Sequence, residues 1–136
     1  MYNNIMSEEI KYKIILVDDD DFLATMYATK FNNSGIATEI CSSGVSLLEK
    51  LKAGEKPDLI LLDIVMPDMS GIEVLEKMHT DKLGEGIPVV MLTNQSDEKD
   101  ISSAKRFDVA GYIVKASATP SEVVEQIVNI IKNSKN

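Results

Sequence analysis

The sequence is poor in cysteine, in aromatic residues and in long apolar runs. Cys41 is the only cysteine among 136 residues, so the chain cannot form an internal disulfide, which fits a reducing compartment. Aromatic residues make up 5% of the chain, and tryptophan is absent. No apolar run approaches the roughly 20 residues of a membrane-spanning helix, and the N-terminus lacks the layout of a secretory signal. We therefore expect a cytoplasmic protein that does not bind membranes.

Positive charge is scarce as well. The chain has 14 Lys and Arg residues against 22 Asp and Glu residues, which leaves a net charge of −8. Because nucleic acids are recognised through clustered basic side chains, we expect no direct nucleic-acid binding by this domain. Hydrophobic residues make up 44% of the sequence, which is enough to form one packed core.

Apolar segments of two kinds alternate along the chain. Short, almost continuous runs predict strands covered on both faces, at 13–17, 37–41, 58–63, 88–92 and 111–115. Segments with helical spacing follow them, at about 21–33, 44–53, 71–79 and 97–108, and a last one begins after Thr119 and has a core face that extends to Ile131. The last helix has the best start signal, because Thr119, Pro120 and Glu122 form a capping box with proline in the first turn. Strands that alternate with helices predict an α/β fold with a mostly parallel sheet.

The predicted elements occupy almost the whole chain. Residues 12–133 are expected to form a single domain, and no repeat or linker divides them. Residues 1–11 are expected to be a flexible N-terminal arm, and residues 134–136 a frayed C-terminus.

Polar side chains follow four of the predicted strands. Asp18 and Asp19 follow the first strand and Asp63 ends the third, while Thr93 follows the fourth and Lys115 ends the fifth. Since ligands of parallel sheets bind at the carboxyl ends of the strands, these side chains are predicted to meet in one cleft. Carboxylates that meet there repel one another, so they either spread into solvent or share a cation.

Four stretches of the chain together resemble a known family. The segments "ILVDDDD", "PDLILLDIVMPDMSGIEVL", "PVVMLTNQS" and "GYIVKA" are similar, in order and spacing, to the receiver domains of two-component response regulators. The resemblance covers about residues 12–132. It implies a single flavodoxin-like, doubly wound (βα)5 domain, whose parallel five-stranded sheet has the strand order 2-1-3-4-5.

The resemblance implies a role for each residue of the predicted cleft. Asp63 matches the phosphoacceptor, Thr93 matches the hydroxyl that hydrogen-bonds the phosphoryl group, and Lys115 matches the cation that pairs with it. Tyr112 matches the aromatic switch residue that follows the movement of Thr93. The positions that match the Mg²⁺ site are Asp18, Asp19, Asp63 and the backbone carbonyl of Val65. Mg²⁺ suits such a site because it takes carboxylates, phosphate oxygens and water as ligands.

The function that the resemblance implies is a signalling switch, not an enzyme that acts on a separate substrate. A sensor histidine kinase or a histidine phosphotransfer protein would donate the phosphoryl group to Asp63. Thr93 and Tyr112 would then change the surface around the fourth helix, the fifth strand and the fifth helix. An unknown downstream protein would bind this surface, and the chain could form a homodimer on phosphorylation.

The sequence departs from the family pattern at the rim of the predicted cleft. Ala116 stands where the family usually has a proline after the lysine. A cis bond before a residue other than proline costs about 2.5–4 kcal/mol, so a trans loop and a strained cis bond both stay open. Asn94 stands where a small residue is common, and Val65 has no polar group to guide water. We therefore expect a long-lived phosphorylated form.

Other functions compete with this one. A haloacid-dehalogenase-like phosphatase also uses a strand-end aspartate with a second acid two residues later, here Asp18 and Asp20. Phe22 departs from its motif, however, and the acidic pair that it needs after the lysine is missing. An EF-hand is excluded because Phe22 and Leu23 stand where a calcium ligand and a glycine are required. A receiver fold that only docks a partner, without phosphorylation, would not need the intact set of cleft residues.

Overall fold

The structure, a computed structural model, describes residues 11–94 and 98–135, and strands alternate with helices as predicted. The strands are β1 (Tyr12–Val17), β2 (Ile36–Cys41), β3 (Leu59–Asp63), β4 (Val89–Thr93) and β5 (Gly111–Val114). The helices are α2 (Asp21–Asn33), α3 (Gly44–Lys52), α4 (Gly71–Thr80), α5 (Glu98–Lys105) and α6 (Pro120–Ser134), and a short 3-10 helix, η1, covers Lys115–Ser117.

The five strands form one parallel sheet in the order β2-β1-β3-β4-β5, which confirms the predicted strand order. Val17 at the end of β1 pairs with Cys41 of β2 and with Leu62 of β3. On the other side of the sheet, Thr93 at the end of β4 pairs with Val114 of β5. The strands therefore end at nearly the same level, and the residues that follow them meet along one edge.

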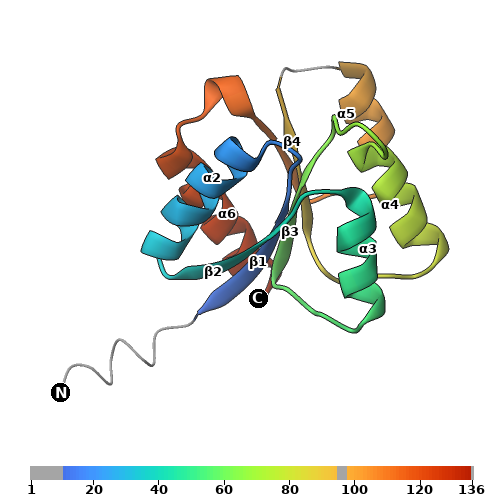
Figure 1. Ribbon diagram of the computed structural model, residues 1–136, viewed down its shortest axis with the longest axis horizontal. Helices are drawn as coiled ribbons and strands as arrows, with labels where there is room; N and C mark the ends of the chain where they lie inside the picture. Colours follow the sequence, from blue (N-terminus) through green and yellow to red (C-terminus); the bar gives the residue numbers. More distant parts are fainter. Residues whose placement is uncertain (1–10, 95–97, 136) are drawn as a thin grey trace.

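Helices cover both faces of the sheet (Figure 1), with α2 and α6 on one face and α3, α4 and α5 on the other. Successive residues of β1 point to opposite faces, so Ile14 belongs to the core under α2 and α6, whereas Ile15 belongs to the core under α3 and α4. Both side chains are fully buried. Burial on both faces explains why the strands are continuous apolar runs in the sequence.

The predicted start of the last helix is confirmed in detail. Thr119 caps α6, and the Glu122 side chain accepts a hydrogen bond from the Thr119 backbone N–H at 2.8 Å, which completes the capping box. Ser70 caps α4 in the same way together with Glu73. Local caps of this kind stabilise a helix end by about 1 kcal/mol, and here they set where each helix begins relative to the sheet edge.

The helix α5 is shorter than the predicted range 97–108, because it ends at Lys105. The next backbone N–H groups turn back through shorter hydrogen bonds, from Phe107 to the Ala104 carbonyl at 3.0 Å and from Asp108 to the Lys105 carbonyl at 3.1 Å. Asp108 then adopts a positive φ of 57°, which ends the helical path.

The ends of the chain lie partly outside the described residues. Of the expected arm, residues 1–11, only Lys11 is described, and Asn136 is also outside. The helix α6 continues to Ser134, and the Nζ atom of Lys135 lies 2.8 Å from a carboxylate oxygen of Asp58. Within the described ranges, no helix combines the length and the apolar composition that crossing a membrane requires.

Candidate functional site

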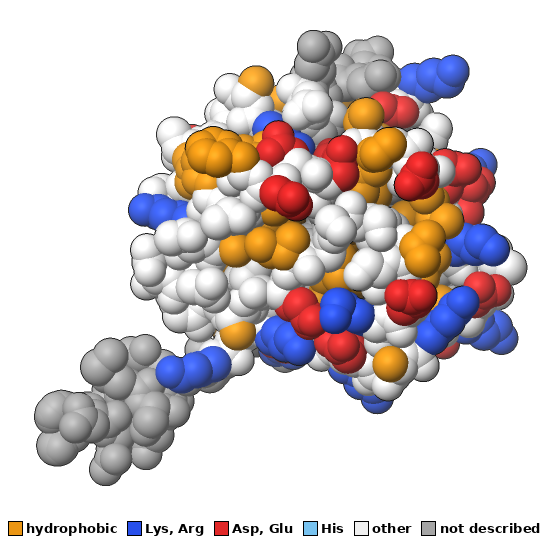
Figure 2. All heavy atoms as spheres, viewed as in Figure 1, with side chains coloured by type: hydrophobic (Ala, Val, Ile, Leu, Met, Phe, Trp, Pro, Cys, Tyr) orange, Lys and Arg blue, Asp and Glu red, His pale blue; other side chains and the backbone are white. Residues whose placement is uncertain are grey.

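The side chains that were predicted to share a cleft lie together at the carboxyl edge of the sheet. Asp18, Asp63 and Thr93 follow or end β1, β3 and β4, and each is at most 3% exposed. The Lys115 side chain reaches them from the end of β5 and is 9% exposed. Figure 2 shows acidic side chains near the place where β1 and β3 end, with hydrophobic side chains on either side of them.

The carboxylates form a compact cluster. One oxygen each of Asp18, Asp19 and Asp63 lies within 4.8 Å of the others, in an arrangement that could hold a metal ion. Asp18 and Asp63 are buried, while Asp19 is exposed, so the cluster opens to solvent on the side of Asp19. An all-oxygen carboxylate set with one open side suits a hard cation such as Mg²⁺, which keeps water and phosphate oxygens among its ligands.

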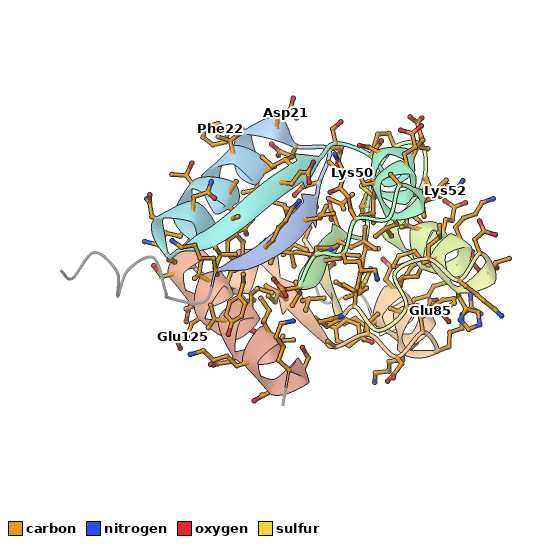
Figure 3. All side chains as sticks on the ribbon, turned by 90° about the horizontal axis from the view of Figure 1, so that it is seen from below. Asp21, Phe22, Lys50, Lys52, Glu85 and Glu125 are labelled. Carbon is orange, nitrogen blue, oxygen red and sulfur yellow. The ribbon has the colours of Figure 1, made fainter. Side chains whose placement is uncertain are left out.

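The four consecutive aspartates have different environments. The buried Asp18 accepts a hydrogen bond from the Asp20 backbone N–H at 3.0 Å, which holds the turn after β1. Asp20 itself caps α2, because its carboxylate accepts from the Leu23 backbone N–H at 3.0 Å. Figure 3 shows Asp21 and Phe22 at the outer side of α2, and Phe22 is 82% exposed. Only the first two aspartates therefore contribute to the cluster.

Lys115 is the cation of this cluster. Its Nζ atom lies 3.0 Å from Oδ2 of Asp18 and 3.4 Å from Oδ2 of Asp63. The other oxygen of Asp63, Oδ1, is buried and has no hydrogen-bond partner within the described part of the chain. A buried carboxylate oxygen without a hydrogen-bond partner destabilises the folded state. This atom is therefore the one in the cluster best placed to bind a further ligand or to react.

The environment makes Asp63 hold its proton unusually well. Burial raises the pKa of Asp63 to about 7; Lys115 opposes this shift, while the nearby Asp18 carboxylate adds to it. For Lys115, burial lowers the pKa, but the carboxylates of Asp63 and Asp18 together outweigh burial and leave the pKa above its usual value. The cleft thus contains one firmly charged ammonium beside a carboxyl group that titrates near neutral pH.

The segment after Asp63 is packed closely against it. A Cβ atom at Gly71 would overlap the carbonyl oxygen of Asp63, so only glycine allows α4 to begin this near to β3. The Gly71 N–H also donates to the Ile64 carbonyl at 2.8 Å. Between them lies Val65, two residues after Asp63, with a side chain 60% exposed. The loop 64–70 is therefore held at both of its ends.

The loop after β5 resolves the alternatives left open at Ala116. No peptide bond in the described ranges is cis, so the Lys115–Ala116 bond is trans. Lys115 enters the 3-10 helix η1, and for this reason β5 ends at Val114, one residue before the predicted end. The lysine nevertheless reaches both buried carboxylates.

The two predicted switch residues lie on neighbouring strands. Thr93 is buried at the end of β4. Tyr112 is half-buried on β5, and its hydroxyl donates to the Ile101 backbone carbonyl of α5 at 3.4 Å. Asn94, which follows Thr93, is exposed. The phenol of Tyr112 thus connects the strand beside Thr93 to the helix α5.

One residue near the cluster was not predicted from the sequence. Tyr27 of α2 is 2% exposed, and burial raises the pKa of its hydroxyl; Lys115 acts against this shift, while Asp18 and Asp63 add to it. These influences place its phenol within electrostatic reach of the cleft. Its only sequence signal is a position on the apolar face of a helix, which is also typical of an ordinary core residue.

Comparisons with known proteins agree with this geometry. A family model described as the response regulator receiver domain matches residues 14–128. The chain is 32% identical over 120 residues to the DNA-binding response regulator MtrA of Mycobacterium tuberculosis, covering 88% of this chain and 50% of MtrA. It is 33% identical over 122 residues to the alkaline phosphatase synthesis transcriptional regulatory protein PhoP of Bacillus subtilis, covering 90% of this chain and 49% of PhoP. The chain thus spans about half the length of these relatives.

Solved structures match over almost the full chain. The receiver domain protein (CheY-like) from Methanospirillum hungatei JF-1 has a TM-score of 0.83 and 26% identity, and the match covers 93% of this chain and 98% of that one. The N-terminal domain of a three-domain response regulator protein from Carboxydothermus hydrogenoformans has a TM-score of 0.79 and 28% identity, covering 90% and 96% of the two chains.

Proposed function

Because this chain belongs to the response regulator receiver domains of two-component signalling, we propose that it accepts a phosphoryl group on Asp63. The donor would be a phosphohistidine of a sensor histidine kinase or of a histidine phosphotransfer protein. The observation that carries the proposal is the buried, partnerless Oδ1 atom of Asp63 beside a lysine and two further carboxylates.

The transfer would use the free oxygen of Asp63. Oδ1 would attack the phosphorus atom, a phosphorus–oxygen bond would form, and the phosphorus–nitrogen bond to histidine would break. The imidazole leaves with the electron pair of that bond and takes up a proton. Lys115, which lies 3.4 Å from Oδ2, would keep the carboxylate oriented and would pair with the transferred phosphoryl oxygens. The hydroxyl of Thr93 would donate a hydrogen bond to the same group.

Mg²⁺ fits this site as a cofactor. The positions that would hold it are Asp18, Asp19, Asp63 and the backbone carbonyl of Val65. Its charge would offset the crowded carboxylates and the phosphoryl oxygens during transfer. The carboxylate cluster and the unpartnered Oδ1 atom support this assignment, because both are features that a hard cation and a phosphoryl group relieve.

Phosphorylation would then act as a switch. A phosphoryl group adds about −1.5 to −2 charges, and we propose that Thr93 moves toward it and that Tyr112 changes its position. Since Tyr112 is hydrogen-bonded to the Ile101 carbonyl, this change would reach the surface of α5, β5 and α6. A downstream protein would bind that surface, and the chain could form a homodimer there. We place the switch in the cytoplasm, without membrane binding and without nucleic-acid binding by this domain.

The competing functions receive no support from the site. The second acid of a haloacid-dehalogenase-like phosphatase would be Asp20, whose carboxylate instead caps α2. A docking module without phosphorylation would have no use for a buried carboxylate with a pKa of about 7.

Intact-mass measurement tests the proposal. Incubation with acetyl phosphate and Mg²⁺ should add one phosphoryl group per chain, and Asp63→Asn or a chelator should abolish the addition. Asp81→Asn, at an exposed position after α4, is the matched control and should label normally. Steady release of phosphate from an ester would instead indicate a phosphatase, and an unlabelled chain would indicate a docking module. The same samples give the lifetime of the label. We expect a long lifetime, because the Asn94 side chain would narrow access to the phosphoryl group and Val65 has no polar group to guide water; a half-life of seconds would contradict this expectation.

A further inference from the structure

A second hollow lies beside the cleft, between the turn after β2 and the loop after β3. We call it the rim pocket. Its volume is about 160 Å³, and its lining combines the apolar residues Val45, Met66, Pro67 and Met69 with the polar residues Ser42, Ser43 and Asp68. Its apolar walls come from one valine, one proline and two methionines, and methionine side chains adapt to the shape of an apolar partner.

The rim pocket is built by close packing of two helix starts. A Cβ atom at Gly44 would overlap a methyl group of Val74 and lie 3.3 Å from the sulfur of Met69, so α3 begins in contact with α4 and the loop before it. Ser43 caps α3 by accepting from the Ser46 N–H at 3.1 Å, and Ser70 caps α4. The residues that line the pocket are therefore next to capped helix ends. Because the caps fix these ends, the pocket is already formed before a partner binds.

The rim pocket borders the mouth of the acidic cleft. The turn after β2 begins beside the cluster, because the Asp18 N–H donates to the Cys41 carbonyl at 3.0 Å. On the other wall, Met66 stands three residues after Asp63 in the chain. Val45 and Val65 are 48% and 60% exposed, so apolar side chains face solvent at this part of the rim. Figure 2 shows hydrophobic side chains next to acidic ones on this face of the molecule.

A protein that donates a phosphoryl group to Asp63 has to cover this rim. Asp63 is only 2% exposed, so the donor histidine has to enter the cleft, and the surface around that histidine comes to rest on the surrounding loops. We propose that the rim pocket binds one apolar side chain of the phosphodonor protein and thereby contributes to donor recognition. An engineered cavity of about 150 Å³ accommodates benzene, so the hollow has room for one leucine, isoleucine, methionine or phenylalanine side chain. This inference rests on the proposed function.

The test compares a protein donor with a small donor that has no side chain to insert. Val45→Glu places a carboxylate at the mouth of the pocket, in the first turn of α3, where negative charge suits the helix dipole and folding is not at risk. The protein donor is the autophosphorylated catalytic part of any histidine kinase, from a panel, that labels the unmodified chain. The small donor is acetyl phosphate.

We expect Val45→Glu to lower kcat/KM for transfer from the kinase at least about tenfold and to leave labelling by acetyl phosphate unchanged. Val45→Leu should keep the transfer rate, because it keeps the apolar contact. Ala53→Glu, an exposed position at the other end of α3, adds the same charge and should also have no effect.

Transfer from the kinase at the unmodified rate in Val45→Glu would overturn the inference and leave the proposed function intact. An equal loss with both donors would overturn it too, because the damage would then lie in the cleft itself. If sedimentation shows that the unmodified chain dimerises and that Val45→Glu abolishes the dimer, the occupant is a second copy and the inference is wrong. A chain that neither donor labels contradicts the proposed function and the pocket's role together.

Discussion

Two charged clusters of this molecule use the same residue types in opposite ways. The outer network consists of Lys13, Glu39, Lys50 and Glu55, on β1, β2, α3 and the loop after α3. Two ammonium groups meet two carboxylates there: Lys13 lies 3.5 Å from each glutamate, and Lys50 pairs with Glu39. All four side chains are 27–50% exposed. The cleft instead gathers three carboxylates around one ammonium, and the two carboxylates that contact it are buried.

The two clusters therefore shift acidic groups in opposite directions. The hydrogen bond from Lys50 lowers the pKa of Glu39, so folding favours the charged form of that side chain. Burial raises the pKa of Asp63 to about 7, so folding disfavours its charged form. The outer network is therefore a set of ordinary surface ion pairs. In the cleft, the buried charge of Asp63 lowers the free energy of unfolding at neutral pH. Destabilising groups of this kind are typical of functional sites.

Removal of the cation of each cluster gives the largest expected contrast. Lys115→Met leaves Asp18 and Asp63 buried beside each other without a counter-charge, and we expect a loss of roughly 3 kcal/mol in the free energy of unfolding. Lys50→Met removes a partly exposed partner and should lower the free energy of unfolding far less, because solvent screens exposed ion pairs. Urea unfolding at neutral pH with a chelator present measures both. Equal losses for the two variants would contradict the distinction between the clusters.

Mg²⁺ should act on the cleft and leave the outer network unaffected. A ligand that binds only the folded chain stabilises it by about 2.7 kcal/mol at a free concentration of 100 times its Kd. We therefore expect Mg²⁺ to raise the melting temperature of the unmodified chain and of Lys50→Met alike. Asp19→Asn should lose most of this rise, because its carboxylate is the exposed member of the cluster. Sodium chloride at the same ionic strength, without divalent cations, is the control and should not raise the melting temperature in this way.

Neutralising Asp63 should stabilise the metal-free protein. Asp63→Asn removes a buried charge that Asp18 repels, and we expect a gain of about 1–3 kcal/mol at slightly alkaline pH. The sign of the pH dependence follows from the raised pKa. Between the unfolded value of about 4 and the folded value of about 7, the folded chain binds more protons than the unfolded chain, so the contribution of Asp63 to stability falls as pH rises.

The difference between the unfolding free energies of the unmodified chain and Asp63→Asn isolates this contribution. The difference should widen from about pH 4 to pH 7 and stay constant above that range. Chelator is present throughout, because Mg²⁺ would favour the charged carboxylate. A difference that does not change with pH would show that Asp63 has an ordinary pKa.

The smallest expected effect belongs to the outer network. Glu39→Gln removes the charge that pairs with Lys50, and we expect a loss below about 0.5 kcal/mol. Because the pKa of Glu39 is lowered, its contribution is present above the unfolded pKa and disappears as pH falls through the folded pKa. This is the reverse of the trend for Asp63. Added salt should shrink the effect of Glu39→Gln, since the side chains are exposed to solvent.

Much of the fold was predictable because its signals are local. The capping box of Thr119 and Glu122 and the N-cap at Ser70 depend on residues three apart, and both helices begin where the sequence indicates. The continuous apolar strands predicted a sheet covered on both faces, and the resemblance supplied the strand order. The end of α5 was less predictable, because the turn at Asp108 depends on a backbone conformation without a distinctive residue pattern.

The candidate site was predictable in its membership but not in its contacts. The positions after the strands indicated which side chains would meet. Asp18, Asp63 and Lys115 do lie together, and Thr93 is buried at the end of the neighbouring strand β4. No pattern indicated that Lys115 would lie closer to Asp18 than to Asp63, at 3.0 Å against 3.4 Å. Nor did any pattern separate Tyr27 from an ordinary core residue.

By itself, the sequence determined the order of strands and helices and the residues that stand at the ends of the strands. Apolar spacing, caps and turns act between residues a few positions apart, so they can be recognised along the chain. The tertiary structure alone decided that Asp63 keeps its proton to about pH 7 and that its Oδ1 atom stays without a partner in the described part of the chain. Desolvation and charge interactions depend on distances in space, and here they join side chains 52 and 97 positions apart.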